Sequence, residues 1–211
     1  PDLLEQEFEH LSRLANEIDA DNWYDILLKD GVEYGHSDPN ADPCGYRAVL
    51  TMQLAEKHYG VPGLYKQLKE EMPAKNIRPK EVDLIALLEA GELDYIFIYR
   101  SVAEQHKAHY VILPDEINLK SAALAGFYKE ASLQITGKKP GEWIEKKGAP
   151  MVYGITLPKN ARNPRWGAQF ISFVLSEAGR EIMAKNGQPE IIPPIVGHKD
   201  QLPDILQDYF E

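Results

Sequence analysis

The chain is poor in cysteine, lacks a long apolar run and has fewer basic than acidic residues. Cys44 is the only cysteine among 211 residues, so no disulfide can form within the chain, and cysteine usage does not indicate a redox compartment. No apolar run approaches the roughly 20 residues that cross a bilayer. The formal net charge of −10 argues against a nucleic-acid-binding protein, because neutralising phosphates requires a basic face.

Targeting and repetitive segments are also missing. The opening stretch PDLLEQEFEH has neither the basic start nor the apolar core of a signal peptide, although a mature protein can have lost one. No internal repeat or low-complexity segment interrupts the chain. With 44% hydrophobic and 27% charged residues, the composition is that of an ordinary globular protein with one domain or two small lobes.

Helical and strand-like stretches alternate along the sequence. Hydrophobic spacing and capping residues predict helices, and short apolar runs predict strands. The predicted helices cover 1–18, a short stretch from about 23, 43–58, 79–91 with Gly91 as its stop, a short stretch from 101, 163–176 and 176–187, and the predicted strands cover the end of 30–37, 95–99, 109–114 and 151–158. Such alternation is typical of α/β lobes with mainly parallel sheets, which bind ligands where strand ends meet helix starts.

The motif Asp42-Pro43-Cys44-Gly45 opens the helix predicted over 43–58. Asp42 is a suitable N-cap, and Pro43 suits the first helical position. The unpaired amides of a first helical turn attract anions, and Gly45 allows a ligand to approach the backbone. The alternatives are a capped helix without a ligand or, with His36 nearby, a reactive Cys44 thiol; a lone cysteine is more commonly a small apolar filler.

Two further residues are candidate ligand contacts. Glu81 lies in the first turn of the helix predicted over 79–91, where acidic residues also occur simply to stabilise the helix dipole. Tyr99 ends the apolar run YIFIY and would face the crevice at the carboxyl end of a parallel strand, unless it is only an aromatic residue at a sheet edge.

A series of motifs then resembles a known family. NWYDIL, SDPNADPCGYRAVL, RPKEVDLIALLEAGELDYIFIYRSVAEQH, LPDEINL, PMVYGITLPKNA and FVLSEAGREIMAKNGQP occur in this order. Together they resemble the tungstate/molybdate-binding proteins of ABC importers, in the archaeal-type branch. The resemblance runs from about Ser12 to the end of the chain.

This resemblance implies a type II periplasmic-binding-protein fold, in which two α/β lobes with mainly parallel sheets close on an oxyanion. It implies that Asp42 and Glu81 bind the tungsten or molybdenum atom directly. Cys44 would donate its main-chain N–H and Tyr99 its hydroxyl to oxyanion oxygens. Glu89 is the rival to Glu81, but only Glu81 shares a helix start with free amides.

The sequence departs from the family pattern at its amino end. The serine-bearing loops of the family's first lobe are missing, and the junction near Glu9–His10 resembles a deletion. We therefore expect an incomplete lobe I, formed by 1–31 and 150–211 with the hinge, and a lobe II formed by 32–149.

The resemblance implies a binding protein and not an enzyme. We expect a monomer without a cofactor that carries tungstate or molybdate to an ABC permease and binds no nucleic acid. It would act outside the cytoplasm, in a periplasm or anchored by lipid at the outer face of the cell membrane. The alternatives are the ligand-sensing domain of a transcription regulator and a thiol-dependent enzyme that uses Cys44.

Overall fold

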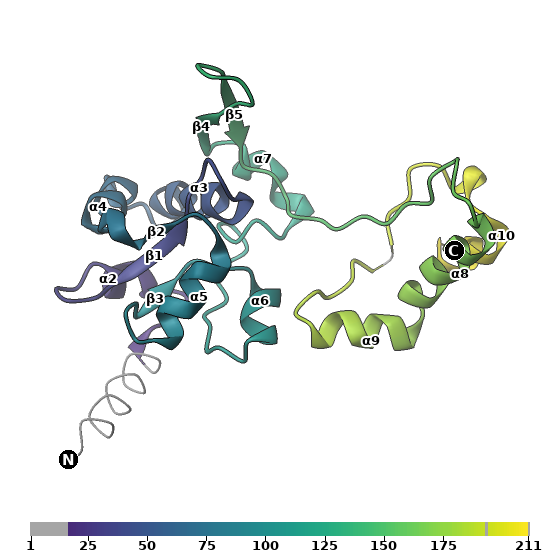
Figure 1. Ribbon diagram of the computed structural model, residues 1–211, viewed down its shortest axis with the longest axis horizontal. Helices are drawn as coiled ribbons and strands as arrows, with labels where there is room; N and C mark the ends of the chain where they lie inside the picture. Colours follow the sequence, from purple (N-terminus) through teal and green to yellow (C-terminus); the bar gives the residue numbers. More distant parts are fainter. Residues whose placement is uncertain (1–16, 193, 211) are drawn as a thin grey trace, which may run out of the picture. The chain divides into compact units, whose positions relative to one another are not determined.

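The computed structural model describes residues 17–192 and 194–210 of the chain. Most of the helix expected over 1–18, and the junction near Glu9–His10, lie outside these residues. The chain forms two compact units, which are described separately (Figure 1). In the described residues the first unit comprises 17–99 and 109–152, and the second comprises 100–108 and 153–210. Residues 17–31 fall in the first unit, and the division into lobes I and II stays a prediction.

A small parallel sheet organises the first unit. Its strands are β1 (Tyr34–Ser37), β2 (Ile77–Arg78) and β3 (Tyr95–Ile96), in the order β2-β1-β3. Both neighbours of β1 run parallel to it, with His36 opposite Ile77 and Tyr34 opposite Tyr95. β1 is buried along its whole length, as expected of a central parallel strand covered on both faces. The expectation of an α/β fold with a parallel sheet is confirmed.

The first unit also contains helices. They are α2 (Trp23–Leu27), α3 (Pro43–Tyr59), α4 (Leu64–Glu71), α5 (Glu81–Glu89) and α7 (Ala125–Tyr128), with short 3-10 turns at Ala74–Asn76 and Ala122–Leu124. α3 and α5 both pack against β1. Local chemistry sets the bounds of α3: Pro43 begins it, and Gly60 ends it in the left-handed conformation at φ 65°.

The core of the first unit lies between α3, α4 and the sheet. Leu54 of α3 and Leu68 of α4 are fully buried, and Tyr34 of β1 donates its hydroxyl to the carbonyl oxygen of Leu68 at 2.7 Å. The cluster also includes Trp23, Leu27, Leu50, Met52, Ala55, Leu64, Met72, Ile117, Leu119, Tyr128 and Ala131. Each fully buried large apolar side chain contributes about 1.5–3 kcal/mol, so this cluster fixes α3 and β1 relative to each other.

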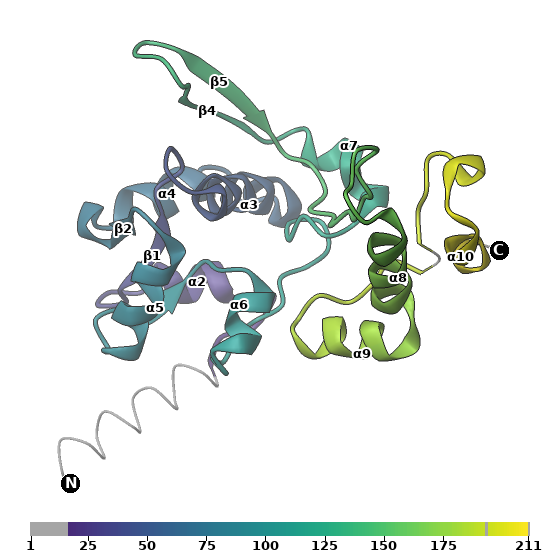
Figure 2. The same cartoon turned by 45° about the vertical axis from the view of Figure 1, so that its right-hand side comes forward.

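An antiparallel hairpin extends from the first unit. β4 (Ser132–Thr136) pairs with β5 (Trp143–Lys147), and Ile135 stands opposite Ile144 (Figure 2). Gly141 in the connecting turn has φ 79°, a value that glycine adopts without strain. The sequence analysis did not anticipate this hairpin, because most of its β5 side chains are polar and exposed.

The second unit is helical in its described residues. It contains α6 (Arg100–Gln105), α8 (Pro164–Leu175), α9 (Glu177–Lys185) and α10 (Asp204–Gln207), with 3-10 turns at Lys199–Gln201 and Asp208–Phe210. α8 packs against α9 and α10. Ser176 separates α8 from α9 and caps α9 by accepting the Gly179 amide at 3.3 Å. The two helices expected over 163–187 are confirmed.

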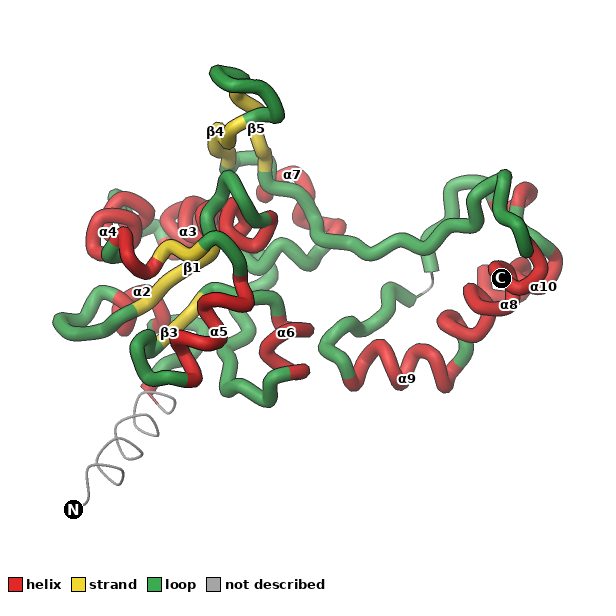
Figure 3. The backbone as a smooth tube through the Cα atoms, viewed as in Figure 1, coloured by secondary structure: helices red, strands yellow, loops and turns green. Residues whose placement is uncertain are grey.

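Two of the expected strands are absent from the structure. Residues 109–114 and 151–158 are extended loops, which Figure 3 draws in green, and β3 ends at Ile96 and not at Tyr99. A strand requires a hydrogen-bonded neighbour, and an apolar run alone does not supply one. None of the helices in the described part of the chain is long and apolar enough to cross a membrane.

Candidate functional site

The candidate residues lie beyond the carboxyl ends of the three parallel strands. Asp42 and Cys44 follow β1, Glu81 follows β2, and Tyr99 follows β3. Loops of a few residues separate each strand from its candidate. The carboxyl edge of a parallel sheet is where α/β proteins place their ligands. The structure therefore brings together all four residues that the sequence analysis singled out.

Asp42 holds the first turns of two helices. Its Oδ1 accepts the amide of Cys44 in α3 at 3.1 Å, and its Oδ2 accepts the amide of Glu81 in α5 at 2.9 Å. One carboxylate therefore satisfies amides at two helix starts, where the partial positive charge of the helix favours an anion. Lys80 strengthens the junction, because its ammonium donates to the carbonyl oxygen of Ala41 at 3.1 Å. The expected N-cap at Asp42 is confirmed.

Glu81 carries a carboxylate oxygen without a protein partner. Its Oε2 is buried and accepts no hydrogen bond from the described residues. Burial raises the pKa of Glu81, the negative charge of Asp42 raises it further, and the Cys44 thiol and Lys80 act in the opposite direction. A buried, unpaired carboxylate oxygen is costly, so this atom requires a ligand or a proton.

Tyr99 is held by an arginine that the sequence analysis did not select. Arg47 donates from Nη1 to the Tyr99 hydroxyl oxygen at 2.5 Å, and its guanidinium lies 5.5 Å from the centre of the Tyr99 ring. Burial raises the pKa of Tyr99 to about 12 although Arg47 opposes the shift. The hydroxyl thus keeps its proton, and because its oxygen accepts from Arg47, that proton remains free for a ligand.

Ser37 and Gly45 set how closely β1 approaches α3. A Cβ atom on Gly45 would lie 2.0 Å from the carbonyl oxygen of Ser37, so only glycine fits at this position. Ser37 is fully buried, and its Oγ has no partner among the described residues. Arg47 and Ser37 are the residues that sequence reasoning missed. The contact of Arg47 with Tyr99 spans 52 residues, and no local pattern could have indicated it.

Comparison with known proteins assigns the family. A family model described as "Bacterial extracellular solute-binding protein" matches residues 11–188, most of the chain. The chain belongs to this family. Its members bind a solute outside the cytoplasm, and a solute-binding role agrees with a candidate site at the carboxyl edge of the sheet.

The names of individual relatives are more specific than the description of the family. The chain is 58% identical over 200 residues to a solute-binding protein of Petrotoga mobilis that has no assigned ligand, covering 95% of this chain and 62% of the relative. It is 44% identical to a molybdate/tungstate-binding protein of Pyrococcus abyssi and 42% identical to one of Thermococcus kodakarensis, in each case over 89% of this chain. These matches cover 60% and 58% of those relatives. The chain thus spans about three fifths of the length of the relatives it matches.

The environment of the Cys44 thiol does not favour nucleophilic catalysis. Burial raises the pKa of Cys44 to about 12, and the carboxylates of Glu81 and Asp42 raise it too. The protonated thiol points to the carbonyl oxygen of Phe97 at 3.6 Å. His36, the candidate base, donates from Nδ1 to the carbonyl oxygen of Ser37 at 2.7 Å. A reactive cysteine needs a lowered pKa, and this site produces the opposite.

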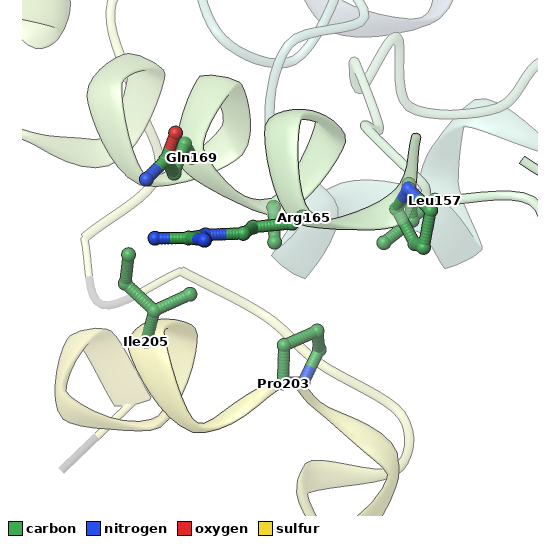
Figure 4. A pocket seen from close by; sticks show the side chains of 7 residues that line it. Leu157, Arg165, Gln169, Pro203 and Ile205 are labelled. Atoms are coloured by element: carbon green, nitrogen blue, oxygen red, sulfur yellow. The ribbon is translucent and has the colours of Figure 1, made fainter. Parts of the chain in front are cut away.

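The second unit contains a cavity whose lining differs in chemistry from the candidate site around Asp42. It measures about 380 Å³ and lies between α8 and the segment that leads into α10. Figure 4 shows the Arg165 side chain between Gln169 of α8 and Ile205 of α10. The remaining lining is apolar, with Leu157, Pro164, Ala168 and Pro203. No carboxylate lines this cavity, so it lacks the donor set found at Asp42 and Glu81.

Proposed function

We propose that this chain is the oxyanion-binding part of an extracytoplasmic solute-binding protein that captures tungstate or molybdate for an ABC importer. The observation that carries the proposal is the buried, unpartnered Oε2 of Glu81 next to the carboxylate of Asp42. Membership of the solute-binding family and the names of two relatives, both molybdate/tungstate-binding proteins, support the choice of ligand. Binding without catalysis, a monomeric state, transfer to a permease, and a periplasmic or lipid-anchored location belong to the same proposal.

Two acidic side chains beside a dianion would normally repel it. Direct bonds from Asp42 and Glu81 to the metal atom remove this conflict, because each carboxylate then acts as a ligand and its charge is neutralised. Both oxygens of Asp42 accept one amide each, and a carboxylate oxygen has a second lone pair available. Among the described residues no group of three or more His, Cys, Asp or Glu could hold a free metal ion. In this proposal the metal atom arrives within the oxyanion.

The oxyanion oxygens need hydrogen-bond donors. The amide of Cys44, expected to reach the oxyanion, already donates to Asp42 Oδ1, and that of Glu81 donates to Asp42 Oδ2, so the starts of α3 and α5 contribute mainly the partial positive charge of two helix dipoles. Tyr99 supplies a protonated hydroxyl. Arg47, whose guanidinium donates to the same hydroxyl oxygen, supplies positive charge. Together these groups balance a doubly negative ligand despite the acidic net charge of the chain, because exposed charges beyond about 10 Å are largely screened.

The same arrangement discriminates against sulfate and phosphate. Their central atoms do not accept two further carboxylate oxygens, so Asp42 and Glu81 would remain negative charges facing an anion. Repulsion of this kind excludes the wrong ligand even where Tyr99 could donate a hydrogen bond to one of its oxygens. We therefore expect tungstate and molybdate to bind, and sulfate and phosphate to bind weakly or not at all.

Calorimetric titration with the four oxyanions tests the proposal. Glu81→Gln should reduce tungstate affinity by at least about a hundredfold, because a metal bond and its charge neutralisation are lost. Asp42→Asn should do the same while leaving an amide oxygen that can still cap α3. Glu89→Gln is the matched control, since Glu89 ends the helix that Glu81 begins. Equal affinity for sulfate and tungstate, or an unchanged affinity in Glu81→Gln, would contradict the proposal.

A further inference from the structure

The charge of the chain opposes the approach of the proposed ligand. Tungstate and molybdate are dianions, and the formal net charge of the chain is −10. The carboxylates of Asp42 and Glu81 add to this repulsion until they bond to the metal atom. A field of the same sign as the ligand lowers the local ligand concentration and slows association. Rapid capture of a dianion therefore requires cations near Asp42 whose charge is not already neutralised.

Two such cations lie against the ring of Tyr46. The guanidinium of Arg47 is 5.4 Å from the centre of this ring, and the ammonium of Lys146 is 5.5 Å from it. A cation within about 6 Å of an aromatic ring centre is attracted by the electrons of the ring. Arg47 also donates to the Tyr99 hydroxyl in the candidate site. The Tyr46 ring therefore connects the candidate site with Lys146, a residue of β5 in the hairpin.

Hydrogen bonds at both ends of β4 hold the hairpin beside α3. The amide of Ser132 donates to Oε1 of Gln53, in the middle of α3, at 2.9 Å. The amide of Thr136 donates at 2.8 Å to Oδ1 of Asn40, which belongs to the loop that leads to Asp42. β4 thus runs along α3 toward the candidate site (Figure 2). The fold therefore fixes where the side chains of the paired strand β5 lie relative to that site.

Neighbouring lysines of β5 face opposite sides of the hairpin, because successive side chains of a strand alternate. Lys146 stands opposite Leu133, and Lys147 stands opposite Ser132. Lys147 forms an ion pair with Glu145 at 3.4 Å. In the part of the chain that the structure describes, no carboxylate forms an ion pair with Lys146. The charge of Lys147 is thus offset by a partner, whereas the charge of Lys146 acts on an approaching anion.

Lys80 adds a third cation beside Asp42, because its ammonium donates to the carbonyl oxygen of Ala41 at 3.1 Å. We call Lys80, Arg47 and Lys146 the basic path. We propose that the basic path attracts the dianion from the side of the hairpin and so accelerates its capture. This inference rests on the proposed function and gives the hairpin a role in ligand entry. Lys146 lies outside the candidate site, so it should affect the association rate and not the contacts of the bound ligand.

Stopped-flow fluorescence with sodium tungstate on the 211-residue chain tests the basic path. Trp23 reports binding, because its ring packs edge-on against Phe97, two residues before Tyr99, with 5.8 Å between the ring centres. Lys146→Gln should lower the association rate constant about threefold in about 0.01 M salt, where charges interact over about 30 Å. The effect should vanish in about 1 M salt, where this distance falls to about 3 Å. The dissociation rate constant should not change, so calorimetry at low salt should show the same threefold loss of affinity.

Lys147→Gln is the matched control, because it removes the same charge at the adjacent position of the same strand. It should associate as fast as the unaltered chain, and Lys146→Arg should retain the fast association. Equal rate constants in Lys146→Gln and the unaltered chain overturn the basic path. Equal losses in Lys146→Gln and Lys147→Gln overturn it too, because net charge alone would then matter. So does a loss that persists at high salt or comes from faster dissociation.

Failure of the basic path and failure of the proposed function give different results. The outcomes above that overturn the basic path all require that the unaltered chain binds tungstate, and they leave the proposed function intact. Absence of calorimetric tungstate binding by the unaltered chain would contradict the proposed function, and the basic path would fall with it.

Discussion

Burial shifts the pKa values of individual side chains around β1 and so determines which of them are protonated at neutral pH. His36 is 5% exposed, and burial lowers its pKa below the usual 6.5, more strongly than Asp38 and the carbonyl oxygen of Ser37 raise it. The neutral imidazole therefore donates from Nδ1 and fixes the end of β1. Cys44 and Tyr99 stay protonated at neutral pH, so the candidate site offers hydroxyl and thiol hydrogen-bond donors and no thiolate nucleophile.

The lowered pKa of His36 predicts a pH dependence of stability. Below pH 6.5 the imidazole of His36 is protonated in the unfolded chain, whereas in the folded chain its lowered pKa keeps it neutral until the pH falls further. The free energy of unfolding should therefore decrease as the pH falls through and below 6.5 and should be fully retained above it. Urea titrations between pH 5 and 8 measure this slope.

His36→Asn should flatten the slope between pH 5 and 6.5, because the titrating group is removed. His58→Asn is the control, since His58 is exposed near the end of α3. An unchanged slope in His36→Asn, or an equal loss of slope in His58→Asn, would show that other groups dominate the acid response.

At the scale of elements, the site depends on how closely β1 and α3 approach. Gly45→Ala would place a methyl group 2.0 Å from the Ser37 carbonyl oxygen, which is fixed backbone. We expect a loss of about 3 kcal/mol in the free energy of unfolding, because β1 and α3 must move apart. Chemical denaturation measures the loss.

Gly126→Ala is the matched control for this change. Gly126 lies in α7, and a Cβ atom there would meet nothing within 4 Å. Alanine favours a helix by about 0.5–1 kcal/mol over glycine, so this variant should be neutral or slightly more stable. If Gly45→Ala were as stable as Gly126→Ala, the close approach of β1 and α3 would not be a structural requirement.

Elements set by local chemistry were predictable from the sequence, and elements set by distant partners were not. The bounds of α3 follow from Asp42, Pro43 and Gly60, all within or beside the helix. The strands expected at 109–114 and 151–158 have the right composition, but pairing is not encoded in the segment itself. The same reason explains the missed Arg47–Tyr99 contact, whereas Asp42 and Glu81 could be selected because each occupies a helix start.

At the scale of the whole molecule, the two units differ in how much apolar surface they bury. The first unit has an extended core around Leu54, Leu68 and Tyr34. In the second unit, the described apolar residues that are buried are Ala103, Ala168, Ile171 and Leu206. A small core supplies little stability against the conformational entropy of the chain.

We therefore expect the second unit to open before the first. In native-state hydrogen exchange of the isolated chain, amides of α8 and α9 should exchange roughly tenfold or more faster than those in the middle of α3. Peptides from α4 serve as the control, because α4 belongs to the larger core and should follow α3. Equal protection in α3 and α8 would indicate a single cooperative unit and would contradict this expectation.

X-ray absorption at the tungsten edge, on the chain saturated with tungstate, tests the central claim most directly. Bonds from the Asp42 and Glu81 carboxylates would raise the number of oxygen neighbours around tungsten from four to six, and Glu81→Gln would reduce it. A spectrum of bound tungstate with four equal oxygen neighbours, unchanged in Glu81→Gln, would contradict the account.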